Sequence, residues 1–368
     1  MYKIGGLIKC KDKVFYMNFV HKKRKNFSGM LPAIEFCILL WSNIEQNINN
    51  MKKILITYNM FREGFAELEE RYDVTFPAGD RDFTYSEVME MIPTYDALCP
   101  MFNFRVNKEL IDCGVKLQLI ANYAVGFDNI DIVYAREKGL TVANTPAPTT
   151  APTANLALAL LLDTARRVTE FDRKLRLNTR FKVGILDNLG VRVTGATLGI
   201  IGMGRIGKAL NKRARACGMD VVYFDNRRLD WNEETSTGAY YVTMDELLEQ
   251  SDFVSLHAPY TPETFHLIGE EALKKMKPTA ILINTSRGPL VDEKALIKAL
   301  QNGEILGAGL DVFEFGGYPS PELLAMEQVV LTPHIGTQTT FTRLEMAKAV
   351  SNNVIGFFEG DRPVCRVY

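Results

Sequence analysis

The stretch Leu198-Gly-Ile-Ile201-Gly202-Met-Gly204-Arg-Ile-Gly207 decides the fold of this chain. A short apolar run meets three glycines at the spacing Gly-x-Gly-x-x-Gly, and an amphipathic helical pattern follows over Lys208–Ala216. The first glycine permits a tight turn, the second lets the backbone approach a pyrophosphate, and the third lets helix and strand pack closely. Because the chain holds 27 glycines, the spacing alone is weak evidence and its surroundings must decide.

An acidic residue stands where this turn requires one. Asp225 ends the next predicted strand, Val221–Phe224, eighteen residues after Gly207. A carboxylate there accepts hydrogen bonds from the adenosine ribose and repels a 2′-phosphate. Strand, turn, helix, strand and acid together predict a Rossmann-type dinucleotide site that takes NAD. Arg227 and Arg228 follow closely and could hold a phosphate, so NADP remains a possible cofactor. The structural alternative is a glycine-rich packing turn that happens to lie beside a surface aspartate.

Working outward, short apolar runs alternate with amphipathic stretches along most of the chain. This alternation predicts an α/β fold, with parallel sheets covered by helices on both faces. Predicted helices besides the one after the glycines are Ser86–Met91, Lys108–Cys113, Ile130–Lys138 and Thr339–Glu359. Predicted strands are Ile54–Thr57, Val74–Phe76, Ala97–Cys99, Leu117–Ile120, Thr141–Ala143, Thr197–Ile201, Val221–Phe224, Phe253–Leu256, Ala280–Asn284, Ile305–Leu310 and Val329–Leu331.

A domain crossing is expected near the middle of the chain. The apolar stretch from Thr150 to Leu162 continues with helical periodicity into charged residues and predicts one long buried helix. The turn-rich run Asn144–Pro148 before it predicts the linker between two domains.

The first fifty residues read differently from the rest. They hold eight Lys or Arg against three Asp or Glu and show no clear helical or strand period. Their apolar run, Met30–Trp41, contains Pro32 and Glu35 and is too short to span a bilayer. A clean strand opens just after Met51, so we expect residues 1–50 to be a disordered leader or a mis-assigned start. A targeting extension is the alternative.

Composition excludes several classes of function. A hydrophobic fraction of 47% and a charged fraction of 24% are ordinary for a globular protein. The net charge of −1 gives no field to attract nucleic acid or a membrane surface. Six scattered cysteines argue against a disulfide framework or a metal site and indicate a reducing, cytoplasmic setting.

Several short motifs follow predicted strands at the sheet edge where α/β proteins bind ligands. The motifs are Gly126-Phe-Asp128-Asn-Ile-Asp131, Asn144-Thr-Pro146, Ser255-Leu-His257-Ala-Pro259, Asn284-Thr-Ser-Arg287-Gly288, Gly309-Leu-Asp311-Val-Phe313-Glu314 and Thr332-Pro-His334-Ile-Gly336. In this order they resemble the D-isomer-specific 2-hydroxyacid dehydrogenase family over Met51–Tyr368. The resemblance implies a flavodoxin-like substrate domain of residues 51–149 and 335–368. It also implies a Rossmann NAD-binding domain of residues 150–334, and a homodimer formed through the long helix.

Two of these residues suit the chemistry of such an enzyme, which would transfer a hydride between NAD(H) and a small 2-hydroxy or 2-oxo acid. Arg287 presents a planar fork for a carboxylate, and His334, one of four histidines, titrates in the range that suits a proton donor. A surface arginine and a structural histidine are the alternatives, and the resemblance favours catalysis. It implies substrate binding by Met101, Phe102, Val125 and Gly126. It implies cofactor binding by Gly202, Met203, Gly204, Arg205, Ile206, Gly207, Asp225, His257, Ala258, Pro259, Thr264, Thr285, Ser286, Asp311 and Gly336.

One position departs from the family pattern. Relatives carry a glutamate five residues past Asp311 that hydrogen-bonds the catalytic histidine, and Gly316 stands there in this chain. A carboxylate partner raises the pKa of a histidine and fixes its tautomer, so we expect His334 to be a weaker acid. Glu314 and Glu322 are the candidate substitutes. The loss favours an alternative function, an NAD(H)-binding sensor or scaffold with little turnover.

The substrate itself is left open by the sequence. Met101, Phe102 and Phe104 fall where the family's substrate loop lies, and they favour an apolar substrate side chain.

Overall fold

The computed structural model describes residues 3–10, 13–20 and 51–368 and divides the chain into two units at Met51. In the first unit, β1 (Lys3–Cys10) and β2 (Lys13–Val20) form an antiparallel pair. These strands differ from the expected leader without structure, and the β-branched and aromatic residues of β2 explain the difference. The prediction for residues 21–50 lies outside the described residues, and a natural start at Met51 stays a prediction.

The larger sheet of the second unit is fully parallel, with the order β10-β9-β8-β11-β12-β13-β14. The strand order reverses between β8 and β11, which is where doubly wound sheets bind ligands. This arrangement confirms the predicted Rossmann architecture. The strands are β8 (Thr197–Ile201), β9 (Asp220–Phe224), β10 (Tyr240–Tyr241), β11 (Phe253–Leu256), β12 (Ile281–Asn284), β13 (Gly307–Leu310) and β14 (Val329–Leu331).

Helices cover both faces of this sheet because its central strands are apolar on both sides. One face packs against α6 (Pro146–Arg166) and α8, and the other against α10, α11 and α12. The helices are α8 (Arg205–Ala216), α9 (Trp231–Thr237), α10 (Met244–Gln250), α11 (Glu270–Lys275), α12 (Glu293–Asn302) and α13 (Pro321–Ala325), with short turns η4 (Pro262–Thr264) and η5 (Gly288–Leu290).

The smaller sheet is also parallel, and its order β4-β3-β5-β6-β7 is flavodoxin-like. Helix α14 (Thr340–Glu359) returns to this sheet and packs on η2, α2 and β6. Beyond α14, Arg366 pairs with Ala143 as an antiparallel bridge. The strands are β3 (Lys53–Ile56), β4 (Asp73–Thr75), β5 (Ala97–Cys99), β6 (Leu119–Ala121) and β7 (Thr141–Ala143). The helices are η2 (Arg62–Phe65), α2 (Ala66–Arg71), α3 (Tyr85–Met91), η3 (Ile92–Thr94), α4 (Lys108–Cys113) and α5 (Ile132–Glu137).

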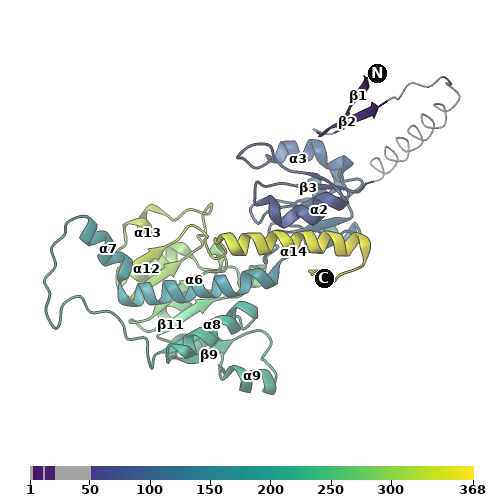
Figure 1. Cartoon of the computed structure of the whole chain (residues 1–368). Coiled ribbons are helices and arrows are strands. Elements are labelled where there is room, and N and C mark those ends of the chain that lie inside the picture. The colour runs from purple at the N-terminus through teal and green to yellow at the C-terminus, as the bar shows by residue number, and fades with distance from the viewer. Residues whose placement is uncertain (1–2, 11–12, 21–50) are drawn as a thin grey trace, which may run out of the picture. The chain divides into compact units, whose positions relative to one another are not determined.

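The connection between the sheets corrects one prediction. Helix α6 (Pro146–Arg166) starts inside the expected linker Asn144–Pro148, four residues before Thr150. The first turn of a helix has no internal partners for its N–H groups, so prolines are tolerated there. The helix ends at Arg166, the next residue Arg167 has a left-handed backbone with φ 58°, and α7 (Val168–Arg176) follows. Figure 1 shows α6 lying beside α14, and the two helices are in contact.

Among the residues that the structure describes, no helix is both long and apolar enough to cross a membrane.

Candidate active site

A cleft of about 850 Å³ is lined by residues from the ends of strands in both sheets and by the start of α14. Most of the predicted site residues meet there. Those that line the cleft are Phe102, Val125, Gly126, Gly204, Arg205, Ile206, His257, Ala258, Pro259, Thr285, Ser286, Arg287, Asp311, His334 and Gly336. Those that do not are Met101, Gly202, Met203, Gly207, Asp225 and Thr264.

The three glycines after β8 differ in what surrounds them. A Cβ on Gly202, whose φ is 96°, would lie 2.7 Å from the nitrogen of Ala258, and one on Gly207 would lie 2.2 Å from the carbonyl oxygen of Gly202. The first and third glycines therefore allow close packing. A Cβ on Gly204 would meet nothing within 4 Å. This open space at the start of α8 fits a pyrophosphate, which the helix N-terminus attracts.

Asp225 ties the glycine turn to the end of β9. Its carboxylate accepts hydrogen bonds from the backbone N–H groups of Met203 at 2.8 Å and Arg227 at 3.1 Å. The guanidinium of Arg228 forms an ion pair with Glu234 at 2.8 Å. Arg228 is thus engaged away from Asp225, which weakens the case for a 2′-phosphate site.

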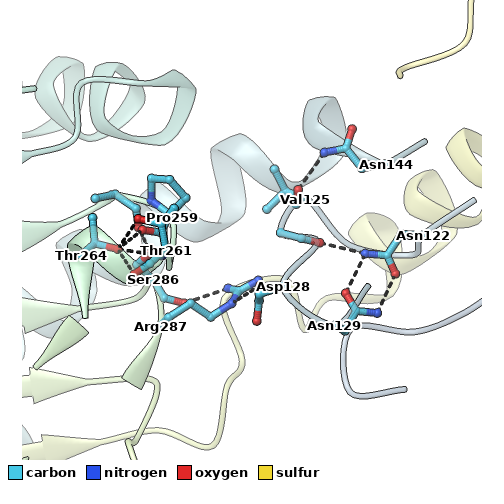
Figure 2. Close-up of polar contacts among 12 residues, drawn as sticks. Asn122, Val125, Asp128, Asn129, Asn144, Pro259, Thr261, Thr264, Ser286 and Arg287 are labelled. Atoms are coloured by element: carbon cyan, nitrogen blue, oxygen red, sulfur yellow. Dashed lines mark hydrogen bonds and ion pairs between the residues drawn. The ribbon is translucent and has the colours of Figure 1, made fainter. Parts of the chain in front are cut away.

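The loop after β11 lines the part of the cleft that also contains the glycine turn after β8. His257 shares a hydrogen bond of 2.9 Å between its Nε2 and the Oγ of Ser255, and burial lowers its pKa to about 4. His257 is therefore neutral at neutral pH. Thr264 lies behind this wall, where its hydroxyl donates to the carbonyl of Pro259 at 2.8 Å (Figure 2). The buried hydroxyl of Thr285 has no partner in the described part of the chain, so it is free for a bound cofactor.

Arg287 lies at the junction of the two domains. Its Nε donates to Asp128 Oδ1 at 2.9 Å, and its Nη1 donates to the carbonyl of Ser286 at 2.8 Å (Figure 2). A Cβ on Gly126 would lie 1.7 Å from Nη2, so the guanidinium packs against the Gly126 backbone. The structure thus joins the predicted carboxylate-binding arginine to the predicted carboxylate-binding loop.

Three asparagines hold that loop in place (Figure 2). Asn122 donates to the carbonyl of Gly126 at 2.8 Å, and Asn144 donates to that of Val125 at 2.7 Å. Asn122 and Asn129 exchange side-chain hydrogen bonds of 3.1 and 3.2 Å. A loop held in this way presents its backbone to a ligand in one fixed geometry.

His334 has a left-handed backbone, with φ 55°, which costs a non-glycine residue about 1–2 kcal/mol. The carboxylate of Asp311 offsets this strain by accepting from the N–H groups of Ile335 at 2.8 Å and Gly336 at 3.0 Å. Burial, and then the charges of Arg287 and Arg343, lower the pKa of His334 to about 4, against an opposing effect of Asp128. Its imidazole is therefore neutral at neutral pH.

Comparison with known proteins identifies the architecture of this cleft. Residues 158–336 match the family model for the D-isomer specific 2-hydroxyacid dehydrogenase, NAD binding domain. Glyoxylate reductase from Thermococcus litoralis is 46% identical over 315 residues, which are 84% of this chain and 95% of the relative. The chain belongs to the D-isomer-specific 2-hydroxyacid dehydrogenase family. It is accordingly an NAD-dependent oxidoreductase of 2-hydroxy and 2-oxo acids, which confirms the prediction, and nothing in these comparisons supports the sensor alternative.

Solved structures of family members agree with the fold. A glyoxylate reductase from Paecilomyes thermophila superposes with a TM-score of 0.79 at 32% identity, covering 86% of this chain and 98% of its own. D-lactate dehydrogenase from Aquifex aeolicus, complexed with NAD and lactic acid, gives 0.75 at 29% identity, covering 84% of this chain and 96% of its own. Both likenesses span the two sheets of the second unit.

The position that departs from the family pattern lies in an open loop. Gly316 has φ +67°, and a Cβ there would meet nothing within 4 Å. Glu314, the first candidate substitute, is engaged elsewhere: its Oε1 lies 2.6 Å from His266 Nε2, and its Oε2 accepts from the N–H of Glu293 at 3.0 Å. Glu322 is exposed on α13. Neither carboxylate therefore replaces the missing glutamate beside His334.

The contacts of Glu314 belong to a buried network beneath this loop. Glu293 is 3% exposed and accepts from the backbone N–H groups of Glu314 at 3.1 Å and Ser320 at 3.2 Å. His266, Asp292 and Glu314 offer metal-ligand atoms within 4.8 Å of one another. The two nitrogens of His266 face different carboxylates, Nε2 toward Glu314 and Nδ1 toward Asp292 at 3.7 Å. We interpret the cluster as a bridge that fastens the loop.

Three charged residues of the cleft were not predicted: Asp128, Arg343 and Arg366. Asp128 lies in the motif Gly126–Asp131, which the sequence singled out, but only Gly126 received a role. Arg343 lies in the first turn of α14, shortly after the motif Thr332–Gly336, but the sequence marked this stretch only as an amphipathic helix.

Proposed function

We propose that the chain reduces a small 2-oxo acid with NADH, with Arg287 binding the substrate and His334 supplying the proton. The observation that carries this proposal is the contact between Arg287 and the Gly126 backbone in the cleft that also holds His334. A guanidinium beside a fixed backbone loop is suited to a carboxylate, which accepts from both. The carbonyl carbon of the oxo acid would then lie between the arginine and the histidine.

The residues of the chain divide the reaction between them. Bound nicotinamide supplies the hydride that C2 of the oxo acid receives. Arg287 holds the carboxylate and polarises the carbonyl oxygen, and His334 donates the proton to that oxygen as negative charge develops on it. Closure of the cleft excludes water from the site during transfer. Asp225 supports NADH over NADPH, because its carboxylate repels a 2′-phosphate.

The substrate proposal is a small oxo acid, with glyoxylate first. The ring of Phe102 lies 4.7 Å from that of His334 and narrows the substrate side of the cleft. Met101 and Phe104 pack into the cores of the substrate domain, so only Phe102 of the three offers an apolar wall. The Thermococcus relative is named for glyoxylate, which has no side chain to accommodate.

Steady-state oxidation of NADH with glyoxylate, hydroxypyruvate, pyruvate and phenylpyruvate tests this proposal. We expect saturable turnover that is fastest with the smallest acids and is lost in His334→Asn. NADH binding without turnover of any of these acids would contradict the proposal and revive the sensor function.

We further propose that the enzyme is a cytoplasmic homodimer. Helix α7 and the segment 177–189 reach away from the larger sheet (Figure 1), and the segment exposes Leu177, Val183, Ile185 and Leu186. Exposed apolar side chains in such number support burial against a second copy. The described cysteines Cys99, Cys113, Cys217 and Cys365 carry no disulfide, which fits a reducing compartment. Light scattering of the purified protein measures the first point, and a monomeric mass would contradict it.

A further inference from the structure

The carboxylate that contacts Arg287 belongs to the other domain. Asp128 follows β6 of the smaller sheet, whereas Arg287 follows β12 of the larger one. Of the groups that Arg287 can donate from, Nε is taken by Asp128 and Nη1 by the carbonyl of Ser286. The edge that carries Nη2 is left facing the Gly126 loop. Asp128 therefore determines which edge of the guanidinium a substrate meets.

The same carboxylate acts on the catalytic histidine through its charge. The charged side chains that act on His334 are Arg287, Arg343 and Asp128. Asp311 contacts the turn of His334 through backbone N–H groups, as described above. Burial and then the two arginines lower the pKa of His334, and Asp128 opposes them. The family's usual glutamate is replaced by Gly316, so the upward effect of Asp128 on the pKa of His334 is not supplemented by a carboxylate at that position.

Resting on the proposed function, we propose that Asp128 is a positioning residue of the reaction. It fixes the guanidinium of Arg287 for the substrate carboxylate, and it provides the negative charge near His334 in a site that lacks the glutamate at position 316. Because the pair joins two domains, the arginine gains this orientation only when the domains meet.

Asp128 could act on substrate binding in two opposite ways, and the direction of the change in a variant shows which one is larger. A carboxylate next to Arg287 also neutralises part of the positive charge that attracts an anionic substrate. If neutralisation were the larger effect, removing the charge of Asp128 would strengthen substrate binding. If orientation is the larger effect, the removal weakens it, as loss of a charge-assisted hydrogen bond does.

The experiment compares Asp128→Asn, Asp128→Glu and the control Asp112→Asn in the whole protein. Asp112 pairs with Lys138 on the surface of the same domain, so the control removes an equal charge away from the cleft. The measurements are KM and kcat for glyoxylate, the pH profile of kcat/KM, and the affinity of oxamate, an unreactive oxo-acid analogue, for the NADH complex. Affinity for NADH alone and the melting temperature report on folding.

We expect Asp128→Asn to raise KM and to weaken oxamate binding about tenfold or more. We also expect its alkaline pH limb to move to lower pH, with NADH affinity unchanged. Asp128→Glu should keep the pH limb while raising KM, and Asp112→Asn should match the wild type. If Asp128→Asn does not fold, Asp128→Glu tests the proposal instead: we expect it to keep the alkaline limb of the pH profile and to raise KM.

Unchanged or tighter oxamate binding with an unmoved pH limb in folded Asp128→Asn would overturn the inference. The proposed function fails separately, if the wild type turns over no oxo acid. Oxamate binding would still report whether Asp128 orients Arg287 in that case.

Discussion

The aromatic ring of Phe102 lies 4.7 Å from the imidazole of His334, centroid to centroid, although the two residues belong to different domains. His334, the proposed proton donor, is thus contacted by a side chain from the domain of the smaller sheet, whereas its backbone turn is held by Asp311 of the larger one. This contact places an apolar wall beside the proposed proton donor. We therefore expect both substrate size and proton transfer to depend on the side chain of Phe102.

Phe102→Ala should change substrate preference. Losing an aromatic contact of about 0.5–1.5 kcal/mol lowers kcat/KM for glyoxylate roughly two- to tenfold. The space released should raise the relative activity with phenylpyruvate. Phe104→Ala is the matched control, because Phe104 stacks on Tyr85 at 5.9 Å and does not line the cleft. An unchanged ratio of the two activities in Phe102→Ala would show that the wall lies elsewhere.

Asp225→Ser should weaken NADH binding and relax the discrimination against NADPH, because an acceptor for the ribose and a repelling charge are both lost. Fluorescence titration with each cofactor measures the two affinities. Asp220→Ser changes an exposed residue at the opposite end of β9 and should leave both unchanged. If the ratio of affinities does not move, Asp225 serves only to hold the N–H of Met203.

Arg287→Lys keeps the positive charge but should still lower kcat/KM strongly. An ammonium cannot contact Asp128, the Ser286 carbonyl and a substrate carboxylate in one plane. We expect a loss of about 2–4 kcal/mol in the transition state, or roughly thirty- to a thousandfold in kcat/KM. Turnover near that of the wild type would identify Arg343, the other arginine that acts on His334, as the group that holds the substrate.

The pH dependence of reduction should reflect the low pKa of His334, which lacks a carboxylate partner at position 316. Reduction needs protonated His334, whose pKa is lowered from 6.5 to about 4, so activity falls as the pH rises through a range below that of an ordinary histidine. Gly316→Glu adds a carboxylate and should move this alkaline limb upward. Its positive φ makes a side chain cost about 1–2 kcal/mol, which a melting curve will show.

Gly317→Glu is the control for that experiment. Gly317 has φ +73° and equally open surroundings, so the variant has the same strain and the same added charge. We expect both variants to melt earlier and only Gly316→Glu to shift the pH profile. Equal shifts would mean that added negative charge, and not a specific partner for His334, moves the limb.

A shortened chain beginning at Met51 should fold and retain cofactor binding and activity. The compact unit that contains both sheets begins at Lys52, and every residue of the cleft lies within it. Equal melting temperatures and kinetic constants for the two lengths would support this prediction. Insolubility of the shorter chain would show that the first fifty residues are structural.

Periodicity predicted the strands well because a buried parallel strand needs a continuous apolar run. Strands β5, β7, β8, β11 and β14 have the expected bounds. The start of α6 was missed because prolines usually end helices, and only the packed structure shows that these occupy a first turn. Arg287 and His334 follow strands in recognisable motifs and could be predicted. The Arg287–Asp128 pair joins residues 159 positions apart, and its geometry depends on asparagines that hold a loop.

The order of the chain sets a constraint on biosynthesis. The smaller sheet leaves the ribosome first, but α14 and the pairing of Arg366 with Ala143 belong to the other end of the sequence. Apolar residues such as Ile54, Ile56 and Ala121, which pack in one core with Val350 and Val354 of α14, stay uncovered until the whole larger domain has been translated. The larger domain can assemble on the ribosome, whereas the smaller one must wait. Nascent chains stalled before α14 are therefore the form of this protein most exposed to aggregation and most in need of chaperones.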